Sequence, residues 1–206
     1  MSLWARYVLP TLVEKACRSH AILAERKRWV PRASGAVLEV GVGSGLNIPF
    51  FDAARATSVV GLDISPELLA RARVRAAAAT VRVDLVEGDA ERMPFDRARF
   101  DTVVLTYTLC SVPTPARTLA EIHRVLRPGG ELIFVEHGRS PDPRAQRLQR
   151  WITPAWRRVG GNCHLDRDIA GELTNAGFPC DEMHAADNAD HPSWLSYKFQ
   201  GIARRP

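Results

Sequence analysis

The chain has 206 residues, 46% of them hydrophobic and 25% charged, with a formal net charge of +5. These values are typical of a soluble globular protein, and the length favours one domain with a substantial core. A modest positive charge does not by itself indicate nucleic-acid binding. No apolar run reaches the length of a membrane span and no signal-peptide pattern opens the sequence, so we expect neither feature and predict a cytoplasmic protein.

The four cysteines show no C-x-x-C motif and no paired spacing; they are Cys17, Cys110, Cys163 and Cys180. This pattern predicts neither a metal site nor a disulfide framework and favours a reducing compartment. We expect Cys110 to be a small buried hydrophobic residue without a catalytic role.

Basic residues gather in two segments of the chain. Residues 1–34 carry seven lysines and arginines against two acids, and residues 139–158 carry six arginines against one acid. Apolar residues at helical spacing over 3–29, interrupted near Pro10, predict an N-terminal helical extension ahead of a single domain at 35–206. Two interpretations of the extension stay open: a packing helix or lid over the substrate, and a peripheral contact with an acidic membrane surface.

A predicted buried strand at 36–40 runs into a turn with glycine at every second position, Gly41, Gly43 and Gly45. Glycine adopts positive φ angles and lets a ligand approach the backbone closely. We expect a helix over 46–54, so that a nucleotide-like ligand lies against free N–H groups at the positive end of that helix.

A second predicted strand, 58–62, ends in Asp63, 18 residues after Gly45. A carboxylate at this place accepts hydrogen bonds from both hydroxyls of a ribose. The G-x-G-x-G spacing and the acid Glu39 disfavour a dinucleotide, because a carboxylate repels a pyrophosphate. S-adenosylmethionine has a ribose, no phosphate and two positive centres, so the charges favour it.

The remaining elements alternate between strands and helices. Strands are expected over 81–87, 100–106 and 131–136, and helices over 66–79 and 115–126. This alternation predicts an α/β fold with a doubly wound, mostly parallel sheet and helices on both faces. Helices over 141–158 and 166–176 follow, and two strands, 178–186 and 194–203, are expected to close the sheet as an antiparallel hairpin.

Five separated motifs resemble, in order and spacing, those of class I S-adenosylmethionine-dependent methyltransferases. They are LEVGVGSG at 38–45, Asp63, GDA at 88–90, FD at 100–101 and RPGGEL at 127–132. The resemblance implies a Rossmann-like, seven-stranded sheet of order 3-2-1-4-5-7-6 whose last strand is antiparallel. A narrower likeness, carried by TLCSV at 108–112, VEH at 135–137 and GNCHLDR at 161–167, is to the methyltransferase-like branch that contains thiol S-methyltransferases. That branch is itself similar to bacterial ubiquinone/menaquinone and phosphatidylethanolamine methyltransferases.

The resemblance implies roles for residues that contact S-adenosylmethionine, the methyl donor that leaves as S-adenosylhomocysteine. Asp63 would hold the ribose, Asp89 and Ala90 the adenine, and Glu39 the ammonium group. Adenosine packing and backbone contacts are expected from the other members of the set: Gly41, Gly43, Gly45, Asn47, Ile64, Leu68, Thr106 and Tyr107.

Methyl transfer from a sulfonium needs no protein nucleophile, but a thiol acceptor reacts as the thiolate, so a nearby base or positive field would help. The candidate bases are His137, at the end of a predicted strand, and His164. A thiol or sulfide acceptor is preferred, on the narrower likeness alone; a phospholipid amine and a quinone precursor are alternatives. A non-catalytic S-adenosylmethionine-binding protein stays open as another class. No target-base motif follows the strand at 100–106, so a small-molecule or lipid acceptor is expected rather than nucleic acid, and no pattern indicates an oligomeric state.

Overall fold

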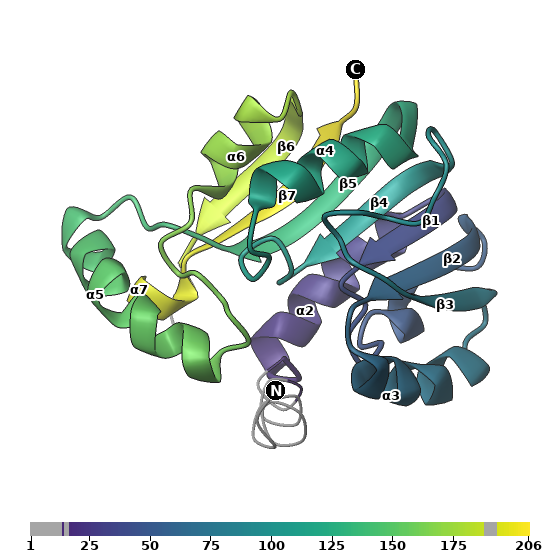
Figure 1. Cartoon of the computed structure of the whole chain (residues 1–206), viewed down its shortest axis with the longest axis horizontal. Helices are drawn as coiled ribbons and strands as arrows, with labels where there is room; N and C mark the ends of the chain where they lie inside the picture. Colours follow the sequence, from purple (N-terminus) through teal and green to yellow (C-terminus); the bar gives the residue numbers. More distant parts are fainter. Residues whose placement is uncertain (1–13, 15–16, 188–192) are drawn as a thin grey trace.

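The computed structural model describes residues 14, 17–187 and 193–206, which form a seven-stranded sheet of order β3-β2-β1-β4-β5-β7-β6 (Figure 1). Strand β7 is antiparallel to its neighbours β5 and β6, and the other neighbouring strands are parallel. The predicted order and the antiparallel strand are therefore confirmed. The strands are β1 Gly35–Val40, β2 Ala56–Asp63, β3 Val83–Glu87, β4 Phe100–Thr106, β5 Leu126–His137, β6 Cys180–Ala186 and β7 Lys198–Arg204.

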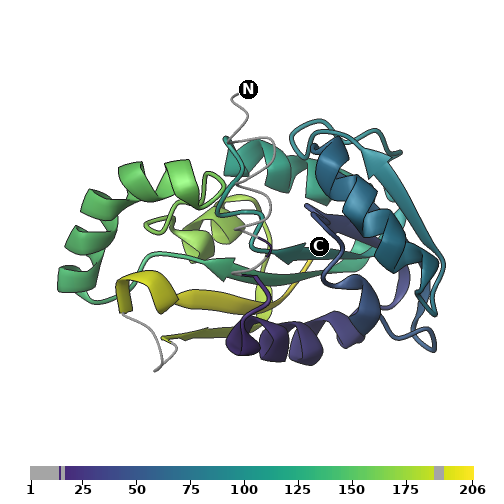
Figure 2. The same ribbon diagram turned by 90° about the horizontal axis from the view of Figure 1, so that it is seen from below.

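Helices cover both faces of the sheet (Figure 2). Helices α4 and α6 share one core cluster with the sheet, and α2 shares a second. Helices α5 and α7 lie beyond the C-terminal ends of the central strands (Figure 1). Among the described residues, no helix has the length and apolar character that crossing a membrane requires. The helices are α2 His20–Trp29, α3 Pro66–Ala77, α4 Pro115–Val125, α5 Pro143–Val159, α6 Ile169–Asn175 and α7 Ser193–Ser196, with 3₁₀ turns η2 Val30–Arg32 and η3 Ile48–Phe50.

The central strands are buried on both faces. Val103, Val104 and Leu105 of β4 are all fully buried. A continuous apolar run is what a strand between two helical layers requires, whereas an alternating run suits a strand with one wet face. The ends of β1 and β4 are thereby fixed in the middle of the molecule, where residues that follow them can meet.

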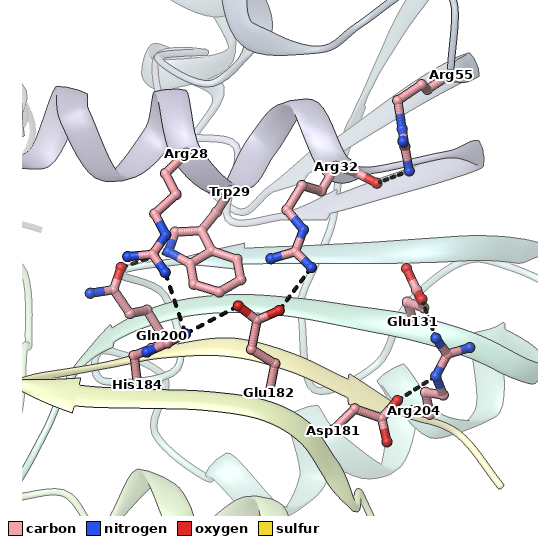
Figure 3. Close-up of polar contacts among 10 residues, drawn as sticks. All are labelled: Arg28, Trp29, Arg32, Arg55, Glu131, Asp181, Glu182, His184, Gln200 and Arg204. Carbon is pink, nitrogen blue, oxygen red and sulfur yellow. Dashed lines mark hydrogen bonds and ion pairs between the residues drawn. The ribbon is translucent and has the colours of Figure 1, made fainter.

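Helix α2 is joined to the far edge of the sheet (Figure 3). Trp29 is fully buried, and its indole N–H donates to Oε1 of Gln200 on β7 at 2.6 Å. Arg32 pairs with Glu182 on β6 at 2.8 Å. Helix α2 is therefore part of the packed structure. The helical pattern predicted for residues 3–13 lies outside the described residues.

Two predicted elements were wrong. The helix expected over 46–54 is a single 3₁₀ turn, Ile48–Phe50, because the chain becomes extended at Phe51 and Asp52 then closes a turn by accepting the N–H of Ala54 at 2.9 Å. The strand expected over 194–203 begins only at Lys198. Its first residues form α7, whose consecutive apolar side chains pack on one cluster instead of alternating between faces.

The burial of Trp29 predicts a large loss of stability on its removal. Trp29→Ala should lower the free energy of unfolding by about 3–5 kcal/mol, because a filled site becomes a cavity and Gln200 loses its donor. Urea unfolding followed by circular dichroism measures this change. Trp151 on α5, 80% exposed, is the matched control: Trp151→Ala should change stability by less than about 0.5 kcal/mol. Equal effects would contradict this packing.

Candidate functional site

The turn after β1 has the predicted backbone conformation. Gly41, Gly43 and Gly45 have φ angles of +74°, +54° and +82°. A Cβ on Gly41 would lie 2.2 Å from Oγ1 of Thr108, so the chain after β4 approaches too closely for any side chain there. A Cβ on Gly43 would meet only the carbonyl of Gly41, at 4.0 Å. Because η3 is one turn long, ligand binding here depends on local N–H groups and not on a helix dipole, which corrects the sequence argument.

Asp63 ends β2 beside this turn. Its Oδ2 accepts the N–H of Gly43 at 2.8 Å and its Oδ1 accepts the N–H of Ser65 at 2.9 Å. Burial raises the pKa of this carboxyl, against the lowering effect of the backbone donors. Each oxygen keeps acceptor capacity for a ribose hydroxyl. Next to it Ile64 is 70% exposed, which leaves an apolar surface for the adenine ring of a ligand. Leu68 is partly buried.

The turn after β3 holds the two residues predicted to contact adenine. Oδ1 of Asp89 accepts the N–H of Glu91 at 2.8 Å, which is an Asx-type turn. Ala90 packs against the core. The N–H of Gly88 in this turn donates to the carbonyl of Asp63 at 3.0 Å, which holds the turn beside the end of β2. The adenine roles stay predictions.

Three predicted residues and one unpredicted residue form a buried polar network. The amide of Asn47 donates to Oε1 of Glu39 at 2.8 Å and to Oγ1 of Thr106 at 2.9 Å. Arg26 of α2 donates to Oδ1 of Asn47 and, at 3.1 Å, to Oγ1 of Thr106. Sequence reasoning missed Arg26. Its position three residues before the buried Trp29, on the same helix face, was the available signal.

Two atoms of this network have no hydrogen-bond partner among the described residues: Oε2 of Glu39 and Nε of Arg26, both buried. A buried polar atom left unpaired costs free energy, so these atoms suit a ligand that carries a donor and an acceptor. The ammonium and carboxylate of a methionine moiety are such a pair. Burial raises the pKa of Glu39 to about 8, against the opposing effects of Arg26 and Asn47.

The segment after β4 is held by a buried carboxylate. Glu136 of β5 is fully buried and accepts the N–H groups of Thr108, Leu109 and Cys110 at 2.8, 2.9 and 2.9 Å. Burial raises the pKa of Glu136, and the three donors oppose that rise. Tyr107, which precedes these residues, adopts a positive φ of 58°.

Tyr107 contacts both helix α2, through Glu25, and His137, one of the two candidate bases. Its hydroxyl donates to Glu25, which also pairs with Lys198 at 2.8 Å. Its ring lies 4.8 Å from that of His137, centroid to centroid. Burial, followed by the negative charge of Glu25, raises the pKa of Tyr107 well above its usual value. Tyr107 therefore stays protonated at neutral pH.

The two candidate bases lie around the same pair of cysteines. His137 Nδ1 is 3.8 Å from Cys163 Sγ, and the backbone N–H of His164 donates to the carbonyl of Cys110 at 2.8 Å. Burial lowers the pKa of His164, with the positive charges of Arg167 and Arg157 adding to the effect. His164 is thus neutral at pH 7 and able to accept a proton.

The raised pKa of Glu39 predicts a pH-dependent stability. Between pH 4.5, its ordinary pKa, and about pH 8 the native carboxyl keeps a proton that the unfolded chain has lost. The free energy of unfolding should therefore fall with rising pH, by up to about 1.4 kcal/mol per unit from this group. Urea unfolding between pH 5 and 8 measures the slope.

Glu39→Gln should remove this contribution, and the same change at the exposed Glu87 should not. Because the raised pKa values of Asp63 and Glu136 act in the same direction, the difference in slope between the wild type and Glu39→Gln isolates Glu39. A slope that Glu39→Gln leaves unchanged would contradict the buried, protonated carboxyl.

Comparison with known proteins gives concordant results. Residues 38–134 match the model of a methyltransferase domain. The human thiol S-methyltransferase TMT1B is 34% identical over 152 residues, 71% of this chain and 62% of the relative. The phosphatidylethanolamine N-methyltransferase of Cereibacter sphaeroides is 41% identical over 105 residues, 50% of this chain and 51% of the relative. The chain thus spans between half and two thirds of the length of these curated relatives.

Solved structures support the fold. A putative methyltransferase from Haloferax volcanii, in complex with the activator Trm112, superposes with a TM-score of 0.73 at 20% identity, over 98% of this chain and 96% of that one. A putative methyltransferase from Bacillus halodurans gives a TM-score of 0.71 at 22% identity, over 90% and 99%. The matched domain, the strand order and these relatives together show that the chain belongs to the class I S-adenosylmethionine-dependent methyltransferases.

Proposed function

We propose that this chain transfers the methyl group of S-adenosylmethionine to the sulfur of a small thiol or sulfide. The observation that carries the proposal is the position of His164, whose backbone N–H donates to the carbonyl of Cys110 at 2.8 Å and whose pKa is lowered by burial. Its neutral imidazole would take the proton that a thiol must lose. The TMT1B relatives, named thiol S-methyltransferases, support the same acceptor.

The donor side of the site would be formed by residues already described. Asp63 would accept from the ribose hydroxyls, and Nε of Arg26 would donate to the carboxylate. The positive ammonium group would favour the ionised form of Glu39, whose Oε2 would then accept from it. Asp89 and Ala90 would contact the adenine above Ile64. The bound cofactor supplies a methyl group already activated by its sulfonium.

The protein's contribution is alignment and proton removal. The acceptor sulfur loses its proton to the imidazole of His164 and forms a bond to the methyl carbon. The bond from that carbon to the sulfonium sulfur would break with its electron pair staying on that sulfur. The donor would thus leave as S-adenosylhomocysteine, a neutral thioether. Holding the acceptor in line can contribute roughly 7–11 kcal/mol to lowering the barrier.

A lipid amine or quinone precursor is the second candidate acceptor, and the surface of α5 favours it. Trp151 is 80% exposed, Val159 50% and Leu148 39%, among the arginines of the same helix. Exposed apolar and basic side chains on one helix suit an anionic membrane surface. The phosphatidylethanolamine N-methyltransferase relative supports this alternative.

Methyl transfer to a panel of acceptors tests the proposal. With methyl-labelled S-adenosylmethionine, we expect label in hydrogen sulfide and small alkyl thiols and not in phosphatidylethanolamine vesicles or a quinol precursor. Label confined to the lipid fraction or the quinol would replace the proposal with the second candidate. Transfer to no acceptor, with cofactor binding intact, would favour a non-catalytic binding protein.

A matched pair of histidine variants serves as the control for the base. His164→Gln should lower kcat for a thiol at least tenfold at unchanged cofactor affinity, and should lower it less at high pH, where the free thiol ionises without help. His123→Gln on α4, away from the site, should leave both parameters unchanged. An unaffected His164→Gln would remove the base assignment.

Cofactor binding has its own test. Asp63→Ala should weaken S-adenosylmethionine binding at least tenfold, about 1.4 kcal/mol, because a charged acceptor of two hydrogen bonds is lost. Isothermal titration measures the change. Asp84→Ala, on the exposed side of β3, should bind normally, and an unchanged affinity in Asp63→Ala would reject the ribose assignment.

A further inference from the structure

Three side chains with metal-binding atoms meet at the acceptor side of the site. Cys110 follows β4, His137 ends β5 and Cys163 follows α5. Their ligand atoms all lie within 4.8 Å of one another, and the two cysteines are 1% and 6% exposed. We propose that Cys110, His137 and Cys163 bind one zinc ion, and that its fourth position takes the sulfur of the acceptor.

The spacing of the ligand atoms suits tetrahedral zinc. With Zn–S distances of about 2.3 Å and Zn–N of about 2.0–2.1 Å, a tetrahedral site places its ligand atoms about 3.5–3.8 Å apart. Cys163 Sγ and His137 Nδ1 are 3.8 Å apart. To bind zinc, the three side chains would therefore need to move by about one ångström or less.

The first loop of the site, residues 107–112 after β4, is held in place by contacts within the protein, without a metal. Glu136 fixes the backbone of Cys110 by accepting its N–H at 2.9 Å. His137, the next residue along β5, is placed by the same strand. Glu136 therefore fixes Cys110 through its carboxylate, and the strand that carries Glu136 places His137.

The second loop, 160–167, is clamped onto the first by three groups. The N–H of His164 donates to the carbonyl of Cys110 at 2.8 Å. The amide of Asn162 donates to the carbonyl of Ser111 at 2.7 Å, and Arg167 donates to that of Val112 at 2.9 Å. Together they hold Cys163 against the first loop. Supporting contacts of this kind orient the ligands of metal sites.

The ligand set favours zinc and leaves its fourth coordination position without a protein ligand. Thiolate and imidazole ligands favour zinc over the hard cations. A zinc site with two cysteines, one histidine and an open fourth position is a catalytic type, whereas structural sites have four protein ligands. Among the described residues, no fourth side chain completes the cluster. Partly buried apolar side chains pack against it and would contact the carbon chain of an acceptor: Ile152, Trp156, Trp194 and Leu195.

The catalytic use of the ion rests on the proposed function. A thiol that binds the fourth position would lose its proton to water and become a zinc-bound thiolate. The thiolate forms the bond to the methyl carbon, and the donor's carbon–sulfur bond breaks with its electron pair. The methylated product is a neutral thioether, which is a weak zinc ligand and therefore leaves the ion.

Cobalt binding tests the site without reference to catalysis. Reduced, metal-free protein titrated with Co²⁺ should take one equivalent and show the absorption bands of tetrahedral cobalt with thiolate ligands, and one equivalent of Zn²⁺ should abolish them. Cys163→Ser and His137→Gln should each weaken binding at least a hundredfold. Cys180→Ser, at a thiol outside the cluster, should bind like the wild type.

The titration of the wild type decides the question even if a variant fails to fold. Absence of the cobalt bands in the wild type at micromolar protein and metal would overturn the site, as would unchanged binding by folded Cys163→Ser and His137→Gln. Adding an alkyl thiol should shift the cobalt spectrum, and removing zinc should lower thiol methylation at least tenfold at unchanged cofactor affinity. A bound ion that neither responds to thiols nor affects their methylation would overturn the acceptor role and leave the proposed function standing.

Discussion

The geometry of the site depends on one buried carboxylate. Glu136 is fully buried and accepts hydrogen bonds from three successive N–H groups after β4 that would otherwise be unpaired. This contact turns the chain sharply at the end of the strand, brings Thr108 against the glycine turn and aims Cys110 at His137. The donor side and the acceptor side of the site are therefore set by the same few hydrogen bonds.

Helix α2 lies on the face of the sheet opposite α4 and α6 (Figure 2) and contacts the site from there. Trp29 anchors α2 to β7, and Arg26, one turn earlier, reaches the polar network that holds Glu39. A change in the docking of α2 would therefore move the groups placed to receive the methionine end of the cofactor. We therefore expect the packing of α2 and the binding of the cofactor to be coupled through that one turn of helix.

Much of the fold could be predicted because its signals are local. Apolar runs mark the central strands, and the conformation of Gly41, Gly43 and Gly45 follows from glycine itself. The helix at 46–54 failed because an Asx turn at Asp52 and an extended Phe51 overrode its propensity. The contact of Arg26 with Thr106 spans 80 residues, and the cysteine–histidine cluster joins residues more than 25 positions apart. Motif spacing cannot detect groups that only the tertiary structure brings together.

A crystal structure with S-adenosylhomocysteine and zinc tests the account most directly, with the metal located by its anomalous signal. We expect one zinc ion between Cys110, His137 and Cys163, and the amino group of the ligand at Oε2 of Glu39. The sulfur of the ligand should face the open coordination position across a gap that a methyl group fills. A ligand whose sulfur points away from the cluster, or zinc density elsewhere alone, would contradict the account.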